Sequence, residues 1–205
     1  MLSEELNVIT ITLYFIICSL SIIIRYFGSY NLVKEIYNDN YLDVTNQWLD
    51  NTKSLFRIVL ESHYYKDTNG NIFYVDNKNV VLDYNDKEYK IAIWLVNTFG
   101  GIIILNPRVN VPKGIKTSDY LWNGESWDLK SLSINAISKN RAVDNLIKRS
   151  KYQAHNIILD ITDTELTIDE IIDQIIYIFN NPKRLWLKKI IIVKAYKLIK
   201  VYERK

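Results

Sequence analysis

The feature that most constrains the fold of this chain is an Asn-Gly pair, Asn123-Gly124, between the short segments TSDYLW and ESWDLKS. Asn-Gly is the preferred two-residue loop of a type I′ β-hairpin, because both positions need a positive φ angle. A loop of two residues also fixes which residues of the two strands face each other. We therefore predict an antiparallel hairpin in which Asp119 lies opposite Asp128.

The predicted register brings two carboxylates together. Side chains alternate along a strand, so Asp128 and Lys130 share one face of it. Like charges at directly opposed positions are destabilising, so the pair needs a compensating cation. The Lys130 ammonium is one candidate, and a divalent metal such as Mg²⁺, held by Asp119 and Asp128, is the other.

Such a group suits phosphodiester hydrolysis. A metal there would polarise the phosphoryl oxygen and lower the pKa of a bound water, while Lys130 orients that water or neutralises developing charge. Glu88, in the preceding predicted helix, is expected to reach the pair as a third metal ligand, and Gln153 to reach it from the other side. Without a metal, Lys116, Thr117 and Lys130 would act as general acid and base, since neither histidine stands near the pair in the sequence.

A plainer interpretation stays open. The two aspartates are also compatible with solvated strand residues, with Lys130 as a surface ion-pair partner of little energetic value. A register shift of one residue would send the carboxylates to opposite faces. The sequence contains no Gly-rich phosphate loop, Cys/His metal cluster or nucleophile elbow, and its single cysteine, Cys18, excludes an internal disulfide.

The pattern from Val80 onward predicts an α+β fold, with a mixed β-sheet flanked by helices. The order is helix-β-β-β-helix-β-helix-β-β, a nuclease-like core over residues 79–205. Helices are expected at 85–99, 139–154 and 167–180, the last opened by a capping box. Strands are expected at 102–107, in the hairpin, and at 156–161, 187–193 and 197–203.

An apolar run near the N-terminus predicts a membrane helix. Residues 8–24 contain no charged residue over seventeen positions, which is the lower limit for spanning a bilayer. Arg25 and Lys34 follow, and the positive-inside bias places the C-terminal part in the cytoplasm. We therefore expect a membrane-anchored protein with its transmembrane segment in residues 1–28. A buried core helix or β structure is the alternative.

Residues 29–78 are predicted to be a spacer. The pattern is helical to about Ser62, and YYKDTNGNIFYVDN then predicts a hairpin.

Local charge indicates a nucleic-acid ligand. The whole chain carries a net charge of only +3. The segment between Lys139 and His155, however, contains five basic residues and one acidic residue. Arg141, Lys148 and Lys151 fall on one side of the predicted helix. A basic helix beside a carboxylate site would hold a phosphate backbone without reading bases, although a solvated helix face is the common alternative.

The same residues carry a resemblance to a known family. From about Val80 the chain resembles the C-terminal nuclease domain of CdiA-type contact-dependent growth inhibition toxins, through GIKTSDYLWNGESWDLKS, SKYQAHNIILDIT and IIIVKAYKLIKVYERK. The resemblance implies that tRNA or another RNA is cut and that an immunity protein is a partner. The site candidates it implies are Lys116, Thr117, Asp119, Asp128, Lys130 and Gln153.

Domains of this kind are related either to metal-dependent PD-(D/E)xK nucleases or to barnase/EndoU/colicin/RelE-like ribonucleases. The strand order and the Asp…Asp-x-Lys spacing favour the first relationship. Ser118 departs from the pattern, because a proline often precedes the aspartate. Two functions result: a toxin-type endoribonuclease, or a catalytically inactive, membrane-anchored module that binds RNA or a protein.

Overall fold

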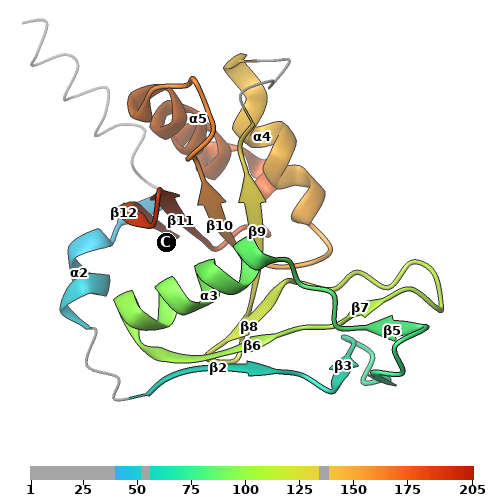
Figure 1. Cartoon of the computed structure of the whole chain (residues 1–205). Coiled ribbons are helices and arrows are strands. Elements are labelled where there is room, and N and C mark those ends of the chain that lie inside the picture. The colour runs from blue at the N-terminus through green and yellow to red at the C-terminus, as the bar shows by residue number, and fades with distance from the viewer. Residues whose placement is uncertain (1–39, 52–55, 134–138) are drawn as a thin grey trace, which may run out of the picture. The chain divides into compact units, whose positions relative to one another are not determined.

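An eight-stranded mixed sheet forms the centre of the structure, a computed structural model that describes residues 40–51, 56–133 and 139–205. Its strands are β1 (Tyr41–Asp43), β2 (Arg57–Glu61), β6 (Gly101–Leu105), β8 (Tyr120–Trp122), β9 (Glu125–Ser131), β10 (Asn156–Asp160), β11 (Lys189–Lys194) and β12 (Lys197–Arg204). In space they follow the order β1-β12-β11-β10-β9-β8-β6-β2 (Figure 1). The strands β9, β10 and β11 are parallel, and β8 and β12 run antiparallel to their neighbours β9 and β11.

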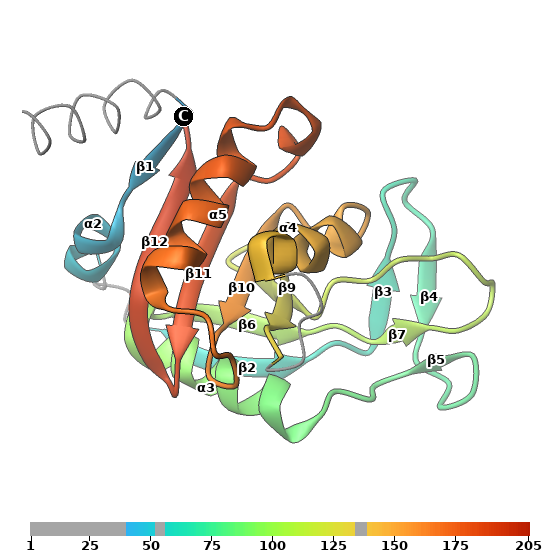
Figure 2. The ribbon, with the colours of Figure 1, turned by 90° about the horizontal axis from the view of Figure 1, so that it is seen from above.

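The helices and the smaller strand pairs surround this sheet. The helices are α2 (Thr45–Asp50), α3 (Asp86–Phe99), α4 (Ala142–Ile147) and α5 (Ile168–Asn180), with 3-10 turns η1 (Lys139–Arg141), η2 (Lys148–Ser150) and η3 (Pro182–Arg184). Two antiparallel pairs are β3 (Tyr64–Lys66) with β4 (Ile72–Tyr74), and β5 (Val80–Val81) with β7 (Arg108–Val109). Both pairs lie at the end away from β1 and α2 (Figure 2).

The predicted α+β class is confirmed, as is the succession of elements around the sheet. From α3 onward the main elements follow as helix, three strands, helix, strand, helix and two strands. Capping boxes open α3 at Asn85 and α5 at Thr167, each with a glutamate three residues later. These local signals define where the helices begin.

Two hydrophobic cores lie on the two faces of the sheet. The core under α4 and α5 contains Ile157 of β10, and the core under α3 contains Trp127 of β9 and Ile158 of β10. Because side chains alternate along each strand, Asp128 lies on the α4–α5 face, beside Ile157 in the parallel register. Lys130 follows two residues on, on the same face.

Part of the predicted helical spacer is wrong. Residues 57–61 form β2, which pairs in parallel with β6, and residues 41–43 form β1, which pairs with β12. A short apolar run cannot be assigned to helix or strand by periodicity alone, and here the partner strand decides. The sheet therefore extends across the predicted boundary at residues 78–79. The predicted hairpin that follows is present as β3 and β4.

The predicted helix at 139–154 is also shorter than expected. It is divided into η1, α4 and η2, with α4 covering only Ala142–Ile147. As a result, the basic residues that follow Ile147 are not presented by one continuous helix.

No helix in the described ranges is long and apolar enough to cross a bilayer. The predicted membrane segment, residues 8–24, lies outside those ranges, so the membrane anchor stays a prediction.

Candidate active site

The predicted hairpin register is confirmed. Tyr120 pairs with Trp127, Leu121 with Ser126 and Trp122 with Glu125. Both turn residues, Asn123 and Gly124, have positive φ angles of 49° and 83°, as a type I′ turn requires.

One step beyond the last paired residues, Asp119 and Asp128 meet. Burial, followed by the neighbouring Asp128 carboxylate, raises the pKa of Asp119 to about 8, against the opposing effect of a hydrogen bond from the Leu129 amide. That amide lies 2.6 Å from Asp119 Oδ2. At neutral pH Asp119 therefore holds a proton, and its neighbour Asp128 is placed to accept a hydrogen bond from it.

Asp128 is 1% exposed and has partners on only one of its two oxygens. Lys130 Nζ forms an ion pair with Oδ2, and Ser150 Oγ of η2 donates a hydrogen bond to the same atom. The other oxygen, Oδ1, has no donor among the side chains and backbone of the described residues. A buried carboxylate oxygen needs a partner. The pair is complete only with a proton shared with Asp119 or with a bound cation.

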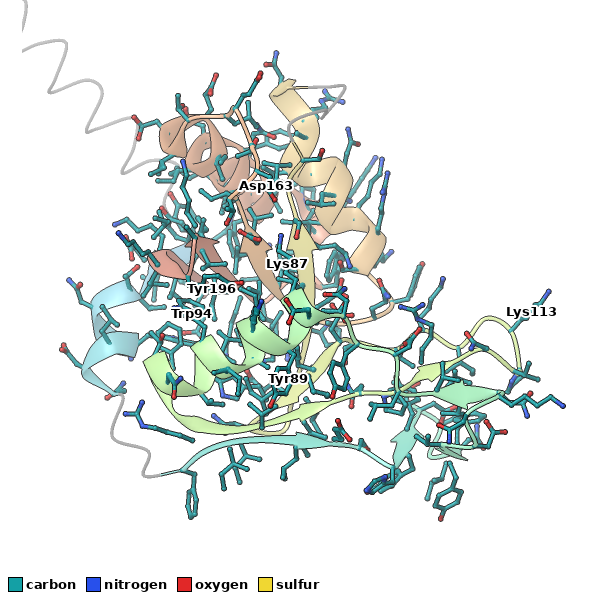
Figure 3. The ribbon with its side chains drawn as sticks, viewed as in Figure 1. Lys87, Tyr89, Trp94, Lys113, Asp163 and Tyr196 are labelled. Atoms are coloured by element: carbon teal, nitrogen blue, oxygen red, sulfur yellow. The ribbon has the colours of Figure 1, made fainter. Side chains whose placement is uncertain are left out.

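A second buried carboxylate, Asp160, has hydrogen-bond or ion-pair partners on both of its oxygens. Lys87 of α3 lies 2.5 Å from one of its oxygens, and the amide and hydroxyl of Thr162 donate to the other at 2.9 and 2.5 Å. Lys87 also lies 3.9 Å from Asp163, and both residues are labelled in Figure 3. Of these two buried carboxylates in the described ranges, only Asp128 has an oxygen without a partner.

The pair fits a divalent cation in its ligand chemistry. Mg²⁺ is commonly held by one or two carboxylates, with waters and substrate phosphate completing its shell. Within the described ranges, no group of three or more His, Cys, Asp or Glu side chains is arranged to hold a metal. Any metal here would have Asp119 and Asp128 as its acidic ligands.

Glu88 is not brought to the pair as predicted. Its carboxylate accepts a hydrogen bond from the Asn85 amide at 2.9 Å and closes the capping box of α3. That helix packs on the opposite face of the sheet from Asp128. The Glu88 side chain caps the N-terminus of α3, which explains why a glutamate stands at this position in the sequence.

The other predicted site residues lie at or against the segment that leads to Asp119. Gln153 Nε2 donates to the carbonyl of Thr117 at 3.2 Å, so Gln153 contacts this segment, and its approach to the carboxylates themselves stays a prediction. Lys116 is exposed, and its carbonyl accepts a hydrogen bond from Tyr65 Oη at 3.0 Å. The segment leading to Asp119 is thus held from both sides.

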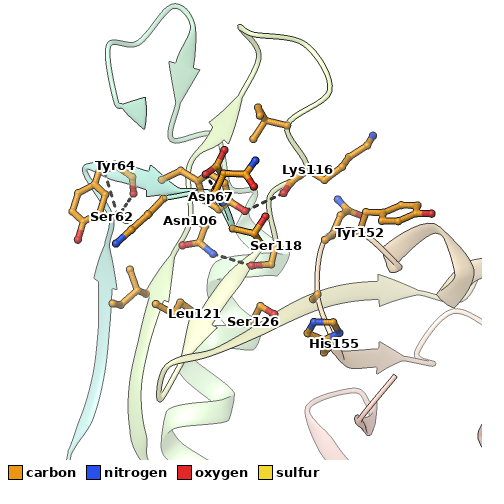
Figure 4. Close-up of a pocket in the computed structure, with 18 of the residues that line it drawn as sticks. Ser62, Tyr64, Asp67, Asn106, Lys116, Ser118, Leu121, Ser126, Tyr152 and His155 are labelled. Carbon is orange, nitrogen blue, oxygen red and sulfur yellow. Dashed lines mark hydrogen bonds between the residues drawn. The ribbon is translucent and has the colours of Figure 1, made fainter. Parts of the chain in front are cut away.

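An open cleft of about 940 Å³ is lined by residues that stand next to the carboxylate pair in the chain, and Figure 4 shows its lining side chains. Its walls come from the β3–β4 hairpin, the end of β6, residues 114–118 and residues 151–155. Ser118 and Ser126 line it, and Asp119 and Asp128 follow one and two positions later in the chain. The two carboxylates themselves do not line the cleft.

The predicted basic face is only partly retained. Lys151 lines the cleft, whereas Arg141 lines a different hollow, with Glu170 and Asp173. Lys148 is exposed and donates to Asn145 Oδ1 at 2.9 Å. Of the three predicted nucleic-acid contacts, Lys151 is the one at the cleft.

Ser150 was missed by the sequence reasoning. It lies on the apolar stripe of the predicted helix at 139–154, and a lone serine on such a stripe was the only available signal. Its partner Asp128 is 22 residues away, so only the fold reveals the contact.

Residues 116–198 match the family model described as the contact-dependent growth inhibition CdiA C-terminal domain. A solved structure described as a CdiA-CT/CdiI toxin and immunity complex from Burkholderia pseudomallei is similar at 20% identity and a TM-score of 0.42. The similarity covers 70% of this chain and 97% of that one. No curated protein matches significantly.

Proposed function

We propose, from the match of residues 116–198 to the model of the CdiA C-terminal domain, that the protein is an endoribonuclease that hydrolyses RNA phosphodiester bonds at Asp119, Asp128 and Lys130. One observation carries the proposal. A buried acid pair with incomplete hydrogen bonding and an adjacent lysine lies next to an open cleft. Strongly perturbed acids of this kind are typical of catalytic sites.

Each residue has a part that follows from its position. Lys130, beside Asp128, supplies positive charge toward the negative charge that develops on the phosphoryl oxygens. Lys116, exposed at the cleft, binds the substrate phosphate. Gln153 donates to the backbone carbonyl of Thr117 and so positions the segment before β8 that bears Asp119.

Asp119 and Asp128 would hold Mg²⁺ when it is present, with both carboxylates ionised. The metal would supply Lewis-acid polarisation and a bound water of lowered pKa. In its absence, the proton on Asp119 removes one negative charge and Lys130 balances the other.

The finer parts of the proposal concern substrate, partner and location. We propose tRNA as the RNA and an immunity protein as the natural inhibitor, because both are implied by the resemblance to CdiA toxins. The apolar run at 8–24 supports membrane anchoring, with the toxin domain facing the cytoplasm.

A second candidate function is favoured by the burial of the pair. With Asp128 1% exposed and neither carboxylate lining the cleft, a catalytically inactive domain that binds RNA or a protein would also retain this geometry. The two functions differ in whether RNA is cut.

The test is a cleavage assay with the full chain, made by cell-free synthesis and incubated with total tRNA in Mg²⁺ or in EDTA. We expect cleavage by the wild type, and loss of cleavage in Asp119→Asn and Lys130→Met. Lys183→Met, which changes an exposed lysine of η3, is the matched control and should cut normally. Intact tRNA with the wild type in both buffers would overturn the proposal, and retained binding would then support the second function.

A further inference from the structure

We propose that the 940 Å³ cleft is a binding site for unpaired RNA, with bases stacked on Tyr64 and Tyr152 and phosphates held by Lys66, Lys116 and Lys151. This inference rests on the proposed function and names the form of RNA that the site accepts.

The two tyrosines lie on opposite walls of the cleft. Tyr64 belongs to β3, is 48% exposed, and has its ring 6.1 Å from that of Tyr74 on β4. Tyr152, which follows η2, is 77% exposed, and Lys151 Nζ lies 5.2 Å from the centre of its ring. Figure 4 shows the two rings on either side of the opening. Exposed tyrosines beside cations are what proteins use to stack successive bases of a single strand.

The charge of the cleft matches a nucleic-acid backbone. Lys66, Lys116 and Lys151 are exposed and have no ion-pair partner in the part of the chain that the structure describes. The lining contains a single carboxylate, Asp67. Its Oδ1 accepts hydrogen bonds from the backbone N–H of Asn69 at 2.9 Å and of Asn71 at 2.8 Å, and its Oδ2 accepts one from Asn71 Nδ2 at 2.9 Å. Because the Asp67 carboxylate binds the backbone of its own loop and not the lysines, the three lysines can bind phosphate.

The cleft is held open by contacts between its walls. Tyr65 Oη donates to the Lys116 carbonyl and ties the hairpin to the segment before Asp119. Gln153 Nε2 donates to the Thr117 carbonyl and ties the opposite wall to the same segment. Asn106 Nδ2 donates to Ser118 Oγ at 3.0 Å at the base of the cleft. A binding site with fixed walls loses less entropy when it takes up a ligand.

The arrangement favours unpaired RNA over a duplex. In an A-form duplex the bases are stacked on each other, and the protein can reach only phosphates, 2′-hydroxyls and groove edges. A duplex would therefore use the lysines but not the tyrosines. Unpaired nucleotides can use both, and the volume lies within the range of sites that enclose a ligand.

The test is a binding measurement in the full chain carrying Asp119→Asn, which prevents cleavage during the experiment. Fluorescence anisotropy is read with a labelled single-stranded RNA of about 12 nucleotides, and with a duplex of the same length. We expect tighter binding of the single strand. Tyr152→Ala and Tyr64→Ala should each weaken it by about 5-fold or more, with the duplex unaffected.

The matched control is Tyr177→Ala, a 54% exposed tyrosine on α5 outside the cleft, which should change binding by less than about 2-fold. Tyr152 is so exposed that its replacement should leave the melting temperature unchanged. The RNA affinity of Tyr152→Ala therefore tests the inference even if Tyr64→Ala unfolds. Equal affinity for single strand and duplex, no change in Tyr152→Ala, or no RNA binding at all would overturn the inference. If the wild type cuts no RNA but the preference for single strands and its loss in Tyr152→Ala are observed, only the proposed function fails.

Discussion

Asp128 differs from an ordinary buried aspartate because its charge is compensated on one side only. Lys130 and Ser150 share Oδ2, while Oδ1 has no protein donor among the described residues. Removing a carboxylate from water without full compensation is unfavourable. The fold tolerates this arrangement because the proton on Asp119 removes one of the two negative charges and Lys130 balances the other, and the proton can be exchanged for another cation.

The raised pKa of Asp119 gives a prediction for stability as a function of pH. Its folded value of about 8 exceeds its ordinary value of 3.8, so between these values the folded protein binds a proton that the unfolded chain releases. The contribution of this group to the free energy of unfolding is fully present below about pH 4 and is lost as the pH rises through 8. Asp119→Asn stays neutral at every pH and should lack this loss.

The measurement is urea unfolding of wild type and Asp119→Asn in EDTA from pH 5 to pH 9. The difference in free energy of unfolding should shift in favour of the variant as the pH rises to about 8 and level off above it. Other groups titrate in both proteins, so their effects cancel in the difference. Parallel profiles would show that Asp119 is not protonated in the folded state.

A bound metal should compete with that proton. At ten times its Kd, Mg²⁺ would stabilise the fold by about 1.4 kcal/mol, or about 3–6 °C in Tm. The rise in Tm should be larger at pH 8 than at pH 6, because fewer protons compete for Asp119 at the higher pH. It should be lost in Asp119→Asn. Sodium chloride at equal ionic strength is the control, and the same rise with either salt would mean that the pair does not hold the metal.

At the scale of elements, the β8–β9 hairpin depends on a close approach at Gly101. The Asn123 side chain accepts a hydrogen bond from the Ile102 amide at 3.0 Å, and a Cβ on Gly101 would lie 2.4 Å from Asn123 Oδ1. Gly101 also has a φ of +94°. Gly101→Ala should therefore displace the turn residue and destabilise the protein by about 2 kcal/mol or more, as measured by urea unfolding.

Gly70→Ala is the matched control for that variant. Its φ of +88° is similar, but no heavy atom lies within 4 Å of the added Cβ. Only the left-handed backbone then opposes the substitution, at about 1–2 kcal/mol. Equal losses in the two variants would show that the contact with Asn123 does not matter.

The elements that the sequence predicted are those whose causes are local. The Asn123-Gly124 turn and the Thr167–Glu170 capping box are each determined within a few residues, and both are present. The strand β2 and the broken helix around α4 depend on distant partners instead. Leu60 pairs with Ile104, far along the chain. Ser150, which the helical pattern places on the apolar face, instead donates a hydrogen bond to Asp128. No local pattern contains that information.

The same division holds for the candidate site. The turn register predicted the meeting of Asp119 and Asp128, and alternation along β9 placed Lys130 beside them. Chain order alone predicts Glu88 as a third ligand, and the capping box accounts for this residue instead. The β3–β4 wall of the cleft lies within the predicted spacer, because nothing in its sequence shows that it packs beside Lys116.

At the scale of the whole molecule, residues before the matched family segment are part of the same cores. Tyr41 of β1 is 5% exposed, with its ring 5.7 Å from Phe179 and 5.6 Å from Tyr202. Trp48 of α2 lies 5.4 Å from Phe99 by ring centroids. Both faces of the sheet are therefore completed by residues 40–51.

This arrangement predicts how truncated chains behave. A fragment of residues 79–205 lacks β1, β2 and α2, and losing a single buried aromatic residue already costs about 3–5 kcal/mol. Domains of this size are stable by only about 5–15 kcal/mol, so the fragment should not unfold cooperatively in urea. A fragment of residues 40–205 keeps every strand of the sheet and should unfold in one transition. A cooperative transition of 79–205 at the same midpoint would show that β1, α2 and β2 are dispensable for folding.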